Sequence, residues 1–281
     1  MLRRISDKRY FEGASYKLLG LAVVPLLLAA CNIPTLDEPI PYSERRFHTE
    51  VVGLSRDGRP IEATIVGQGS ETLLLTAVIH GNEPAGKPLL ERLIQELRAR
   101  PNLGRDRRLI IVPVVNPDGL AKRTRFNARG VDLNRNFPSR NWKRRKRHGS
   151  YQASEPETRA VLKLIRQFDP CRILAVHSPL KMVNYDGPAE GLARAMSARC
   201  GLPAEGSVGY PTPGSLGSYA GHDWKIPTIT LELSNRENAS NVWQRFGSAV
   251  ETFVDLPTPA RTPWNDPNRT ARTRTRGRGS L

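Results

Sequence analysis

His80 and Glu83 are the first residues of this sequence whose types and spacing could do chemistry. They follow an apolar run over residues 73–79, which predicts a buried strand. They precede Pro84, whose fixed φ suits the first turn of a helix. Open α/β sheets place their sites at the carboxyl ends of strands, and zinc accepts nitrogen and oxygen ligands of these two types. The stretch therefore predicts half of a metal site.

A catalytic zinc site needs a third protein ligand and an open position for water. We expect His177 to be that ligand, because it ends a predicted strand over residues 172–176 as His80 ends the earlier one. A lone histidine there would more often be a hydrogen-bonded core residue, but His80 and Glu83 favour a ligand. The other three histidines are interpreted as surface or structural residues: His48, His148 and His222.

Glu232 lies within a predicted strand over residues 227–233, where a carboxylate is unusual. Near a zinc site, such a carboxylate can take a proton from water and pass it to a leaving amine. A salt bridge to one of the many arginines is the alternative interpretation. We predict Glu232 as the general base.

Three further residues fall in a long segment over residues 120–154 that shows little regular periodicity: Arg125, Asn134 and Arg135. Loops of this length inside a domain are usually functional or disordered. An arginine beside an amide can bind a carboxylate through several hydrogen bonds, and a second arginine near a metal can stabilise an oxyanion. In so basic a chain, arginines alone would carry little weight.

Strands and helices that could position these residues alternate along the chain. We predict strands over residues 47–53, 61–67, 73–79, 108–115, 172–176 and 227–233, and helices over 84–100, 154–168, 189–200 and 239–253. Ser154 and Glu157 suggest a capping box for the second helix. This alternation predicts an α/β fold with a mixed, mostly parallel twisted sheet and helices on both faces.

The N-terminus resembles an export signal. Basic residues precede an apolar run over residues 18–30, and Leu-Ala-Ala before Cys31 resembles the cleavage site of a bacterial lipoprotein. An ordinary signal peptide and an uncleaved anchor are the alternatives. We expect a signal peptide (1–31) lipidated at Cys31, a tether (32–46), a catalytic domain (47–256) and a basic disordered tail (257–281). The protein would then be exported and anchored to a membrane, facing the periplasm or the outer cell surface.

The chain is strongly basic, with 43 Lys and Arg against 27 Asp and Glu among 281 residues, a net charge of +16. Part of this excess lies in residues 140–147. Nucleic acid, lipid headgroups and anionic wall polymers would all be attracted, so charge alone chooses no partner, and no specific nucleic acid is expected. Cys171 and Cys200 could form a disulfide or remain as thiols. The oligomeric state is left open.

Several motifs in order resemble the zinc carboxypeptidase family of M14-type metallopeptidases: HGNEPAG from His80, NPDG from Asn116, RFNARGVDLNRNFP from Arg125, then His177 and Glu232. The resemblance covers about residues 73–254. It implies that His80, Glu83 and His177 bind one Zn²⁺, as two histidines and a glutamate do in carboxypeptidase A. It also implies an oxyanion role for Arg125, carboxylate binding by Asn134 and Arg135, and Glu232 as the base.

Within that family, SEPET from Ser154 and SVGYPTPGSLGSY from Ser207 are most similar to murein peptide amidases. These cleave the γ-D-glutamyl–meso-diaminopimelate bond of cell-wall peptides. The resemblance makes Tyr210 the candidate for a tyrosine that closes over substrate, with Tyr219 as the alternative. Ser178 stands where the amidases carry an acidic residue after the third zinc ligand. Recognition of the second amine of diaminopimelate is therefore left open.

The function expected from these observations is zinc-dependent hydrolysis of an amide bond next to a C-terminal carboxylated residue, in murein peptides. One alternative is an acyl-amino-acid deacylase of the same fold. The other is a non-catalytic lipoprotein that binds the wall through its basic segments.

Overall fold

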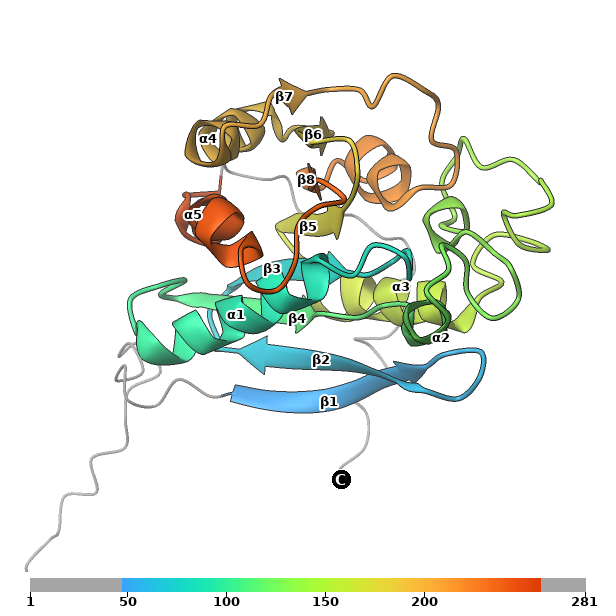
Figure 1. Cartoon of the computed structure of the whole chain (residues 1–281), viewed down its shortest axis with the longest axis horizontal. Helices are drawn as coiled ribbons and strands as arrows, with labels where there is room; N and C mark the ends of the chain where they lie inside the picture. The colour runs from blue at the N-terminus through green and yellow to red at the C-terminus, as the bar shows by residue number, and fades with distance from the viewer. Residues whose placement is uncertain (1–46, 259–281) are drawn as a thin grey trace, which may run out of the picture. The chain divides into compact units, whose positions relative to one another are not determined.

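The computed structural model describes residues 47–258, and its centre is an eight-stranded mixed sheet (Figure 1). Its strand order is β1-β2-β4-β3-β5-β8-β6-β7. The strands are β1 (Phe47–Leu54), β2 (Pro60–Val66), β3 (Glu71–Ala77), β4 (Arg107–Val112), β5 (Arg172–His177), β6 (Met182–Asp186), β7 (Ala204–Glu205) and β8 (Thr228–Glu232).

The four central strands, β4, β3, β5 and β8, are parallel to one another. At one edge β2 pairs antiparallel with β4, and β1 antiparallel with β2. At the other edge β6 is antiparallel to β8, and β7 is parallel to β6. The predicted mixed, mostly parallel sheet is therefore confirmed. Parallel strands bring their carboxyl ends to a common edge, where ligand sites of such sheets lie.

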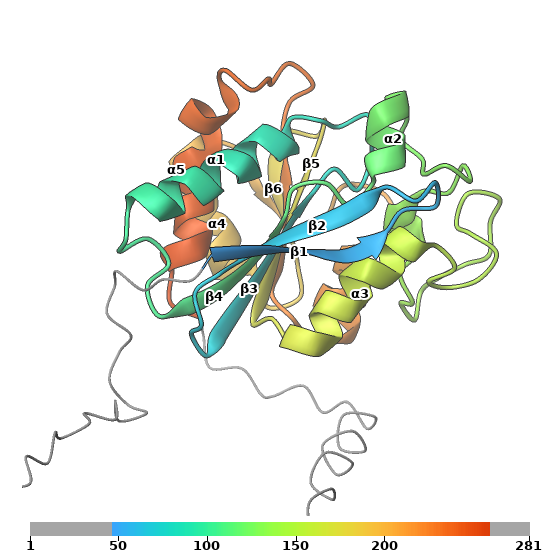
Figure 2. The ribbon, with the colours of Figure 1, turned by 90° about the horizontal axis from the view of Figure 1, so that it is seen from below.

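Helices cover both faces of the sheet, as predicted (Figure 2). On one face lie α1 (Gly86–Ala99), α4 (Glu190–Cys200) and α5 (Val242–Asp255). On the other lie α3 (Pro156–Phe168) and the π-helix η3 (Gly217–Asp223). Because side chains alternate along a strand, Leu73 and Leu75 pack under the first group of helices, and Leu74 packs under the second.

Several boundaries and elements differ from the sequence-based expectations. β3 ends at Ala77, because Val78 takes a left-handed φ of 50°. The segment over residues 120–154 is not without regular structure: it begins within α2 (Pro117–Lys122) and contains the 3₁₀ turn η2 (Leu133–Arg135). The strands β6 and β7 and the π-helix were not predicted. These elements are short, so they show too few turns or alternations for a periodic pattern.

The predicted capping box at the start of α3 is wrong. Ser154 Oγ donates to Glu155 Oε1, 2.7 Å away, and no side chain caps the helix. Glu157 instead accepts hydrogen bonds from the amide of Arg56 and from Asn127 Nδ2. The carboxylate is used for tertiary contacts, which a local motif does not reveal.

Cys171 and Cys200 are free and half-buried, so the thiol interpretation holds rather than the disulfide. Cys31, the signal peptide, the tether and the tail beyond residue 258 lie outside the described residues. Within residues 47–258, no helix combines the length and apolar character needed to span a bilayer.

Candidate metal centre

A sharp loop after β3 positions His80 and Glu83. The amides of Val115 and Asn116 donate to the carbonyls of Ala77 and Val78, so the chain after β4 holds this loop in place. A glycine is required at position 81, because a Cβ there would collide with the backbone of residue 119. The loop then turns back through a bond from the Glu83 amide to the His80 carbonyl.

His177 and Glu232 come from neighbouring parallel strands. His177 ends β5, Glu232 ends β8, and the two residues are paired in the register of the sheet. Residues paired in this way project to the same face. The two side chains therefore lie over one end of the sheet, on the face that α3 and η3 cover.

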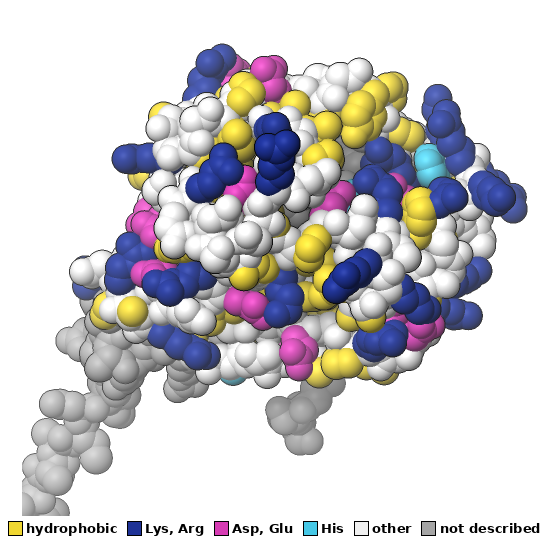
Figure 3. All heavy atoms as spheres, in the orientation of Figure 1, with side chains coloured by type: hydrophobic (Ala, Val, Ile, Leu, Met, Phe, Trp, Pro, Cys, Tyr) yellow, Lys and Arg dark blue, Asp and Glu magenta, His cyan; other side chains and the backbone are white. Residues whose placement is uncertain are grey.

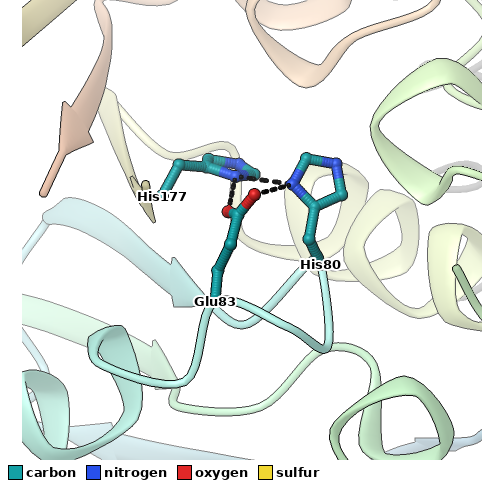
Figure 4. A group of neighbouring side chains, drawn as sticks. All are labelled: His80, Glu83 and His177. Atoms are coloured by element: carbon teal, nitrogen blue, oxygen red, sulfur yellow. Dashed lines mark hydrogen bonds and ion pairs between the residues drawn. The ribbon is translucent and has the colours of Figure 1, made fainter. Parts of the chain in front are cut away.

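The side chains of His80, Glu83 and His177 converge in the structure (Figure 4). Nδ1 of His80 lies 2.8 Å from Glu83 Oε1, and Nδ1 of His177 lies 2.8 Å from Glu83 Oε2. The two Nδ1 atoms are 3.1 Å apart. All three residues are buried, and one ligand atom from each lies within 4.8 Å of the others. Two imidazoles and one carboxylate are the donor set of several catalytic zinc sites.

Asp132 is a residue that sequence reasoning missed. Its Oδ1 lies 3.0 Å from His80 Nε2 and also accepts from the amide of Asn134. A carboxylate at this position favours a proton on Nε2 and leaves the Nδ1 lone pair of His80 for a cation, as is usual for metal-binding histidines. These residues therefore suit a metal ion. The motif that contains Asn134 and Arg135 also contains Asp132, so the sequence offered a signal for this residue.

The pKa directions agree with a site that favours a cation. Burial by itself would raise the pKa of Glu83, but His177 and His80 outweigh it and hold that pKa well below its usual range. Burial would likewise raise the pKa of Asp132, but His80 and then Arg125 lower it. Burial would lower the pKa of His80, but Asp132 and Glu83 outweigh it and raise that pKa. The carboxylates are thus anionic beside the imidazoles.

The general-base candidate, Glu232, lies in the pocket that contains this group. Its Oε2 accepts a hydrogen bond of 3.3 Å from the amide of Leu180. Burial, together with the charge of Glu83, raises the pKa of Glu232 against the opposing effect of His177. A raised pKa suits a carboxylate that takes up and releases a proton.

The three residues of the long segment also line this pocket. Arg125 donates from Nε to Asp132 Oδ2 (3.0 Å), and its Nη1 lies 3.4 Å from Glu83 Oε1. Asn134 Oδ1 accepts from the amide of Leu216, and Arg135 Nη1 donates to the Asn134 carbonyl. The structure thus brings all the predicted polar residues to one pocket.

Of the two tyrosine candidates, Tyr210 lines the pocket and is 51% exposed. Tyr219 is buried, with its ring packed 6.3 Å from that of Phe137 and 6.2 Å from that of Trp224. A side chain locked in the core has no room to close over substrate. Burial therefore eliminates Tyr219, and the role of Tyr210 stays a prediction.

A further carboxylate that sequence reasoning missed, Asp186, lines the pocket. Asn184 and Asp186 project from β6, and Thr230 and Glu232 project from β8, so alternate residues of two strands line it. The Asp186 side chain is only 14% exposed, and Oδ1 lies 2.9 Å from His222 Nε2. Burial raises the pKa of Asp186, and His222 opposes this. No motif marked Asp186, because β6 is too short to predict.

The chain is similar to known zinc carboxypeptidases in sequence. The model of the M14 zinc carboxypeptidases matches residues 42–196. Murein peptide amidase A of Escherichia coli (strain K12) is 36% identical over 205 residues, which cover 66% of this chain and 81% of the amidase. The chain belongs to the zinc carboxypeptidase family.

Solved structures agree with this membership. The murein-tripeptide amidase MpaA from Escherichia coli O157 superimposes with a TM-score of 0.63 at 31% identity, covering 76% of this zinc carboxypeptidase and 93% of the amidase. Carboxypeptidase A from Helicoverpa armigera superimposes with a TM-score of 0.62 at 18% identity, covering 74% and 66%, and shows the shared fold alone.

Family membership makes this chain a hydrolytic enzyme, a metallopeptidase, and implies zinc as its metal. The alternative of a non-catalytic wall-binding protein is therefore wrong. The residues present fit zinc, because His80, Glu83 and His177 converge and Asp132 orients the first of them.

Proposed function

We propose that this zinc carboxypeptidase hydrolyses the amide bond next to a C-terminal carboxylated residue in murein peptides, of the γ-D-glutamyl–diaminopimelate type, with one Zn²⁺. One observation carries the proposal. The pocket that holds the metal-ligand group is also lined by Asn134 and Arg135, which suit a carboxylate, and by Asp186, which suits an ammonium group. A diamino acid with a free carboxylate presents both groups.

His80, Glu83 and His177 would hold the zinc ion in this proposal. When bound, zinc polarises a carbonyl group and lowers the pKa of water. Glu232, on the strand next to His177, takes a proton from the attacking water and passes it to the leaving amine. Arg125 stabilises negative charge that develops on the scissile carbonyl oxygen.

Asp186 offers a carboxylate, which Ser178 does not. The amidases carry an acidic residue after the third zinc ligand, and this chain carries a serine there. Asp186 supplies a buried carboxylate to the same pocket from β6. Gly217 gives it room, because a Cβ at that position would collide with Asp186 Oδ2. We propose that Asp186 binds the second amine of the released residue.

Mass spectrometry of muropeptide digests, with and without a chelator, tests the main proposal. We expect loss of diaminopimelate from γ-D-glutamyl–diaminopimelate peptides, abolished by the chelator and restored by Zn²⁺. Purified protein that binds zinc yet cleaves no murein peptide would refute the proposal. Turnover of N-acyl amino acids in preference to peptides would instead favour the deacylase.

Asp186→Asn tests the recognition of the amine. We expect the variant to raise KM for diaminopimelate peptides about tenfold or more, as expected when a buried charged partner is lost, with little effect on analogues that lack the second amine. Glu91→Gln, which removes a carboxylate from the exposed face of α1, is the matched control. Equal effects of Asp186→Asn on both substrates would show that Asp186 has only a structural role.

We further propose that the enzyme is exported and lipid-anchored at Cys31, facing the periplasm or the outer cell surface. The support is the charged, apolar and small-residue pattern of residues 1–31. Cell fractionation with metabolic labelling by a fatty acid tests this. We expect label on the natural chain and none on Cys31→Ser, which should leave the membrane fraction. Label that persists on Cys31→Ser would overturn the assignment.

A further inference from the structure

A basic loop borders the metal centre and takes no part in the chemistry described above. Residues 140–147 contain six cations and no acid: Arg140, Lys143, Arg144, Arg145, Lys146 and Arg147. All six are exposed, and the ion pairs that form among residues 47–258 involve other side chains. Arg147 stacks on the Phe126 ring, 3.9 Å from its centroid. So dense a cluster of unneutralised charge costs self-repulsion, and anions would relieve it.

Hydrogen bonds to its backbone anchor the loop at both ends. Nδ1 of the buried His148 ring forms a hydrogen bond of 2.8 Å with the Lys143 carbonyl. The backbone amide of His148 donates to the Arg145 carbonyl (3.0 Å). At the other end, the amide of Arg140 donates to Asp223 Oδ2. These anchors use backbone atoms of the loop, and its charged side chains are exposed.

The basic loop adjoins the metal centre directly. The carbonyl of Arg147 accepts a 2.8 Å hydrogen bond from the amide of Asp132, whose carboxylate contacts His80. Across residues 120–154 the chain has eleven Lys and Arg and a single acid, the buried Asp132. Lys and Arg side chains gather on the right of Figure 3, where Figure 1 places the green loops between β4 and α3. A polyanion bound here would lie beside the pocket.

The chemistry of the proposed substrate identifies the partner, so this inference rests on the proposed function. Each γ-linked glutamyl residue keeps its α-carboxylate free, and diaminopimelate adds further carboxylates. Murein strands therefore carry a dense array of carboxylates beside every bond to be cut. We propose that the basic loop binds the carboxylates of neighbouring peptides on the murein polymer, so that the enzyme favours polymer-attached peptides over free ones.

Other polyanions fit the loop less well. Insertion into a bilayer needs exposed large apolar side chains, and stacking on single-stranded nucleic acid needs exposed aromatic ones. Residues 140–147 expose neither, because their only aromatic residue, Trp142, is half-buried and its Nε1 is enclosed. Tyr151, beyond the loop, is a large aromatic side chain that is 63% exposed. The loop thus offers charge alone, and the choice of a carboxylate polymer rests on the proposed substrate.

Binding to insoluble murein sacculi tests the inference, measured by sedimentation of the full chain in a Glu232→Gln background that blocks cleavage. The loop variant replaces four cations and keeps the backbone carbonyls that bond His148: Lys143→Gln, Arg144→Gln, Arg145→Gln and Lys146→Gln. We expect it to bind sacculi about tenfold more weakly at low salt, with a smaller dependence of binding on salt. With Glu232 intact, its kcat/KM on free tripeptide should stay within about twofold of the parent.

A control variant removes the same charge from exposed positions on α3 and α4: Lys163→Gln, Arg166→Gln, Arg194→Gln and Arg199→Gln. It should bind sacculi as the parent does. Equal binding of sacculi by parent and loop variant would overturn the inference, as would tighter binding of the parent to phosphatidylglycerol vesicles, inorganic polyphosphate or duplex DNA than to sacculi. Failure of the chain with Glu232 intact to cleave free tripeptide would count against the proposed function and leave the binding result intact.

Discussion

His80 makes three contacts that define how it could bind a cation. Its Nε2 faces Asp132, and its Nδ1 faces Glu83 and the Nδ1 of His177. Two facing nitrogen lone pairs beside a carboxylate are unfavourable unless a proton or a metal ion lies between them. Through His80, the buried carboxylate of Asp132 therefore affects the affinity of the site for metal.

Asp132→Asn tests this connection. The amide keeps the size of the side chain but loses the charge that favours a proton on His80 Nε2. We expect zinc affinity to fall about 10–100-fold, as for other residues that orient metal ligands. Competition with a fluorescent chelator measures it, and Glu50→Gln on β1 serves as the control. Unchanged zinc affinity would mean that Asp132 only binds Arg125 and stabilises the loop.

Glu232→Gln tests the general base. The glutamine keeps the acceptor for the Leu180 amide but no longer takes up a proton. We expect kcat on the murein tripeptide to fall about 10²–10⁴-fold, the usual contribution of general acid–base catalysis, with zinc content unchanged. Metal analysis and steady-state kinetics on one preparation measure both. Activity close to the parent's would assign the base elsewhere.

At the scale of elements, the turn between β1 and β2 is joined to α2. Ser55 Oγ and the amide of Asp57 donate to the carboxylate of Asp118, 2.8 and 2.9 Å away, and Arg59 also bonds to it. Burial would raise the pKa of Asp118, but these hydrogen bonds outweigh it and lower that pKa. Because α2 packs against the loop that carries His80, the turn supports the site indirectly.

Asp118→Asn should lower the free energy of unfolding by about 1–3 kcal/mol at pH 7, the usual cost of losing hydrogen bonds to a charged group. Since the folded-state pKa lies below the unfolded value of about 3.9, the carboxylate stabilises the fold above that pH. This contribution is lost as the pH falls through the folded-state pKa.

Urea unfolding at pH 7 and at acidic pH measures the difference between the natural chain and Asp118→Asn. The difference should shrink once the pH falls below about 4. A difference that grows toward acid pH would contradict the sign of the shift. Glu50→Gln, on an exposed position of β1, should show little difference at either pH.

At the scale of the whole molecule, the metal-ligand group joins two segments that are distant in sequence. His80 and Glu83 lie after β3, and His177 ends β5. A ligand that binds only the folded state stabilises it in proportion to the logarithm of its concentration over its dissociation constant. Zinc should therefore stabilise the entire domain.

Removal of zinc with a chelator should lower Tm by about 5–10 °C, assuming metal at about 100 times its dissociation constant and a domain of this size. Added Zn²⁺ should restore both Tm and hydrolysis of tripeptide. Differential scanning calorimetry measures the shift. His177→Ala should show no response of Tm to zinc, and an equal response would place the metal elsewhere.

The sequence by itself determined the parts that depend on local pattern. Long apolar runs predicted β3, β4, β5 and β8, and alternation with helices predicted the class of fold. Polar side chains within or just after apolar strands, such as Glu232, identified most of the pocket. The strand predictions succeeded because buried strands leave strong signals over few positions. The structure also brings the predicted polar residues to one pocket, and their catalytic roles stay predictions.

Tertiary structure alone decided the rest. Tyr210 and Tyr219 are close in sequence, but packing of η3 buries Tyr219 and leaves Tyr210 at the pocket. Asp132 and Asp186 meet their partners, His80 and His222, on other segments of the chain. The pairing of β6 with β8 brings Asp186 to the pocket, and a five-residue strand carries too little pattern to predict it. Such contacts depend on which segments meet in the fold, and local sequence does not encode this.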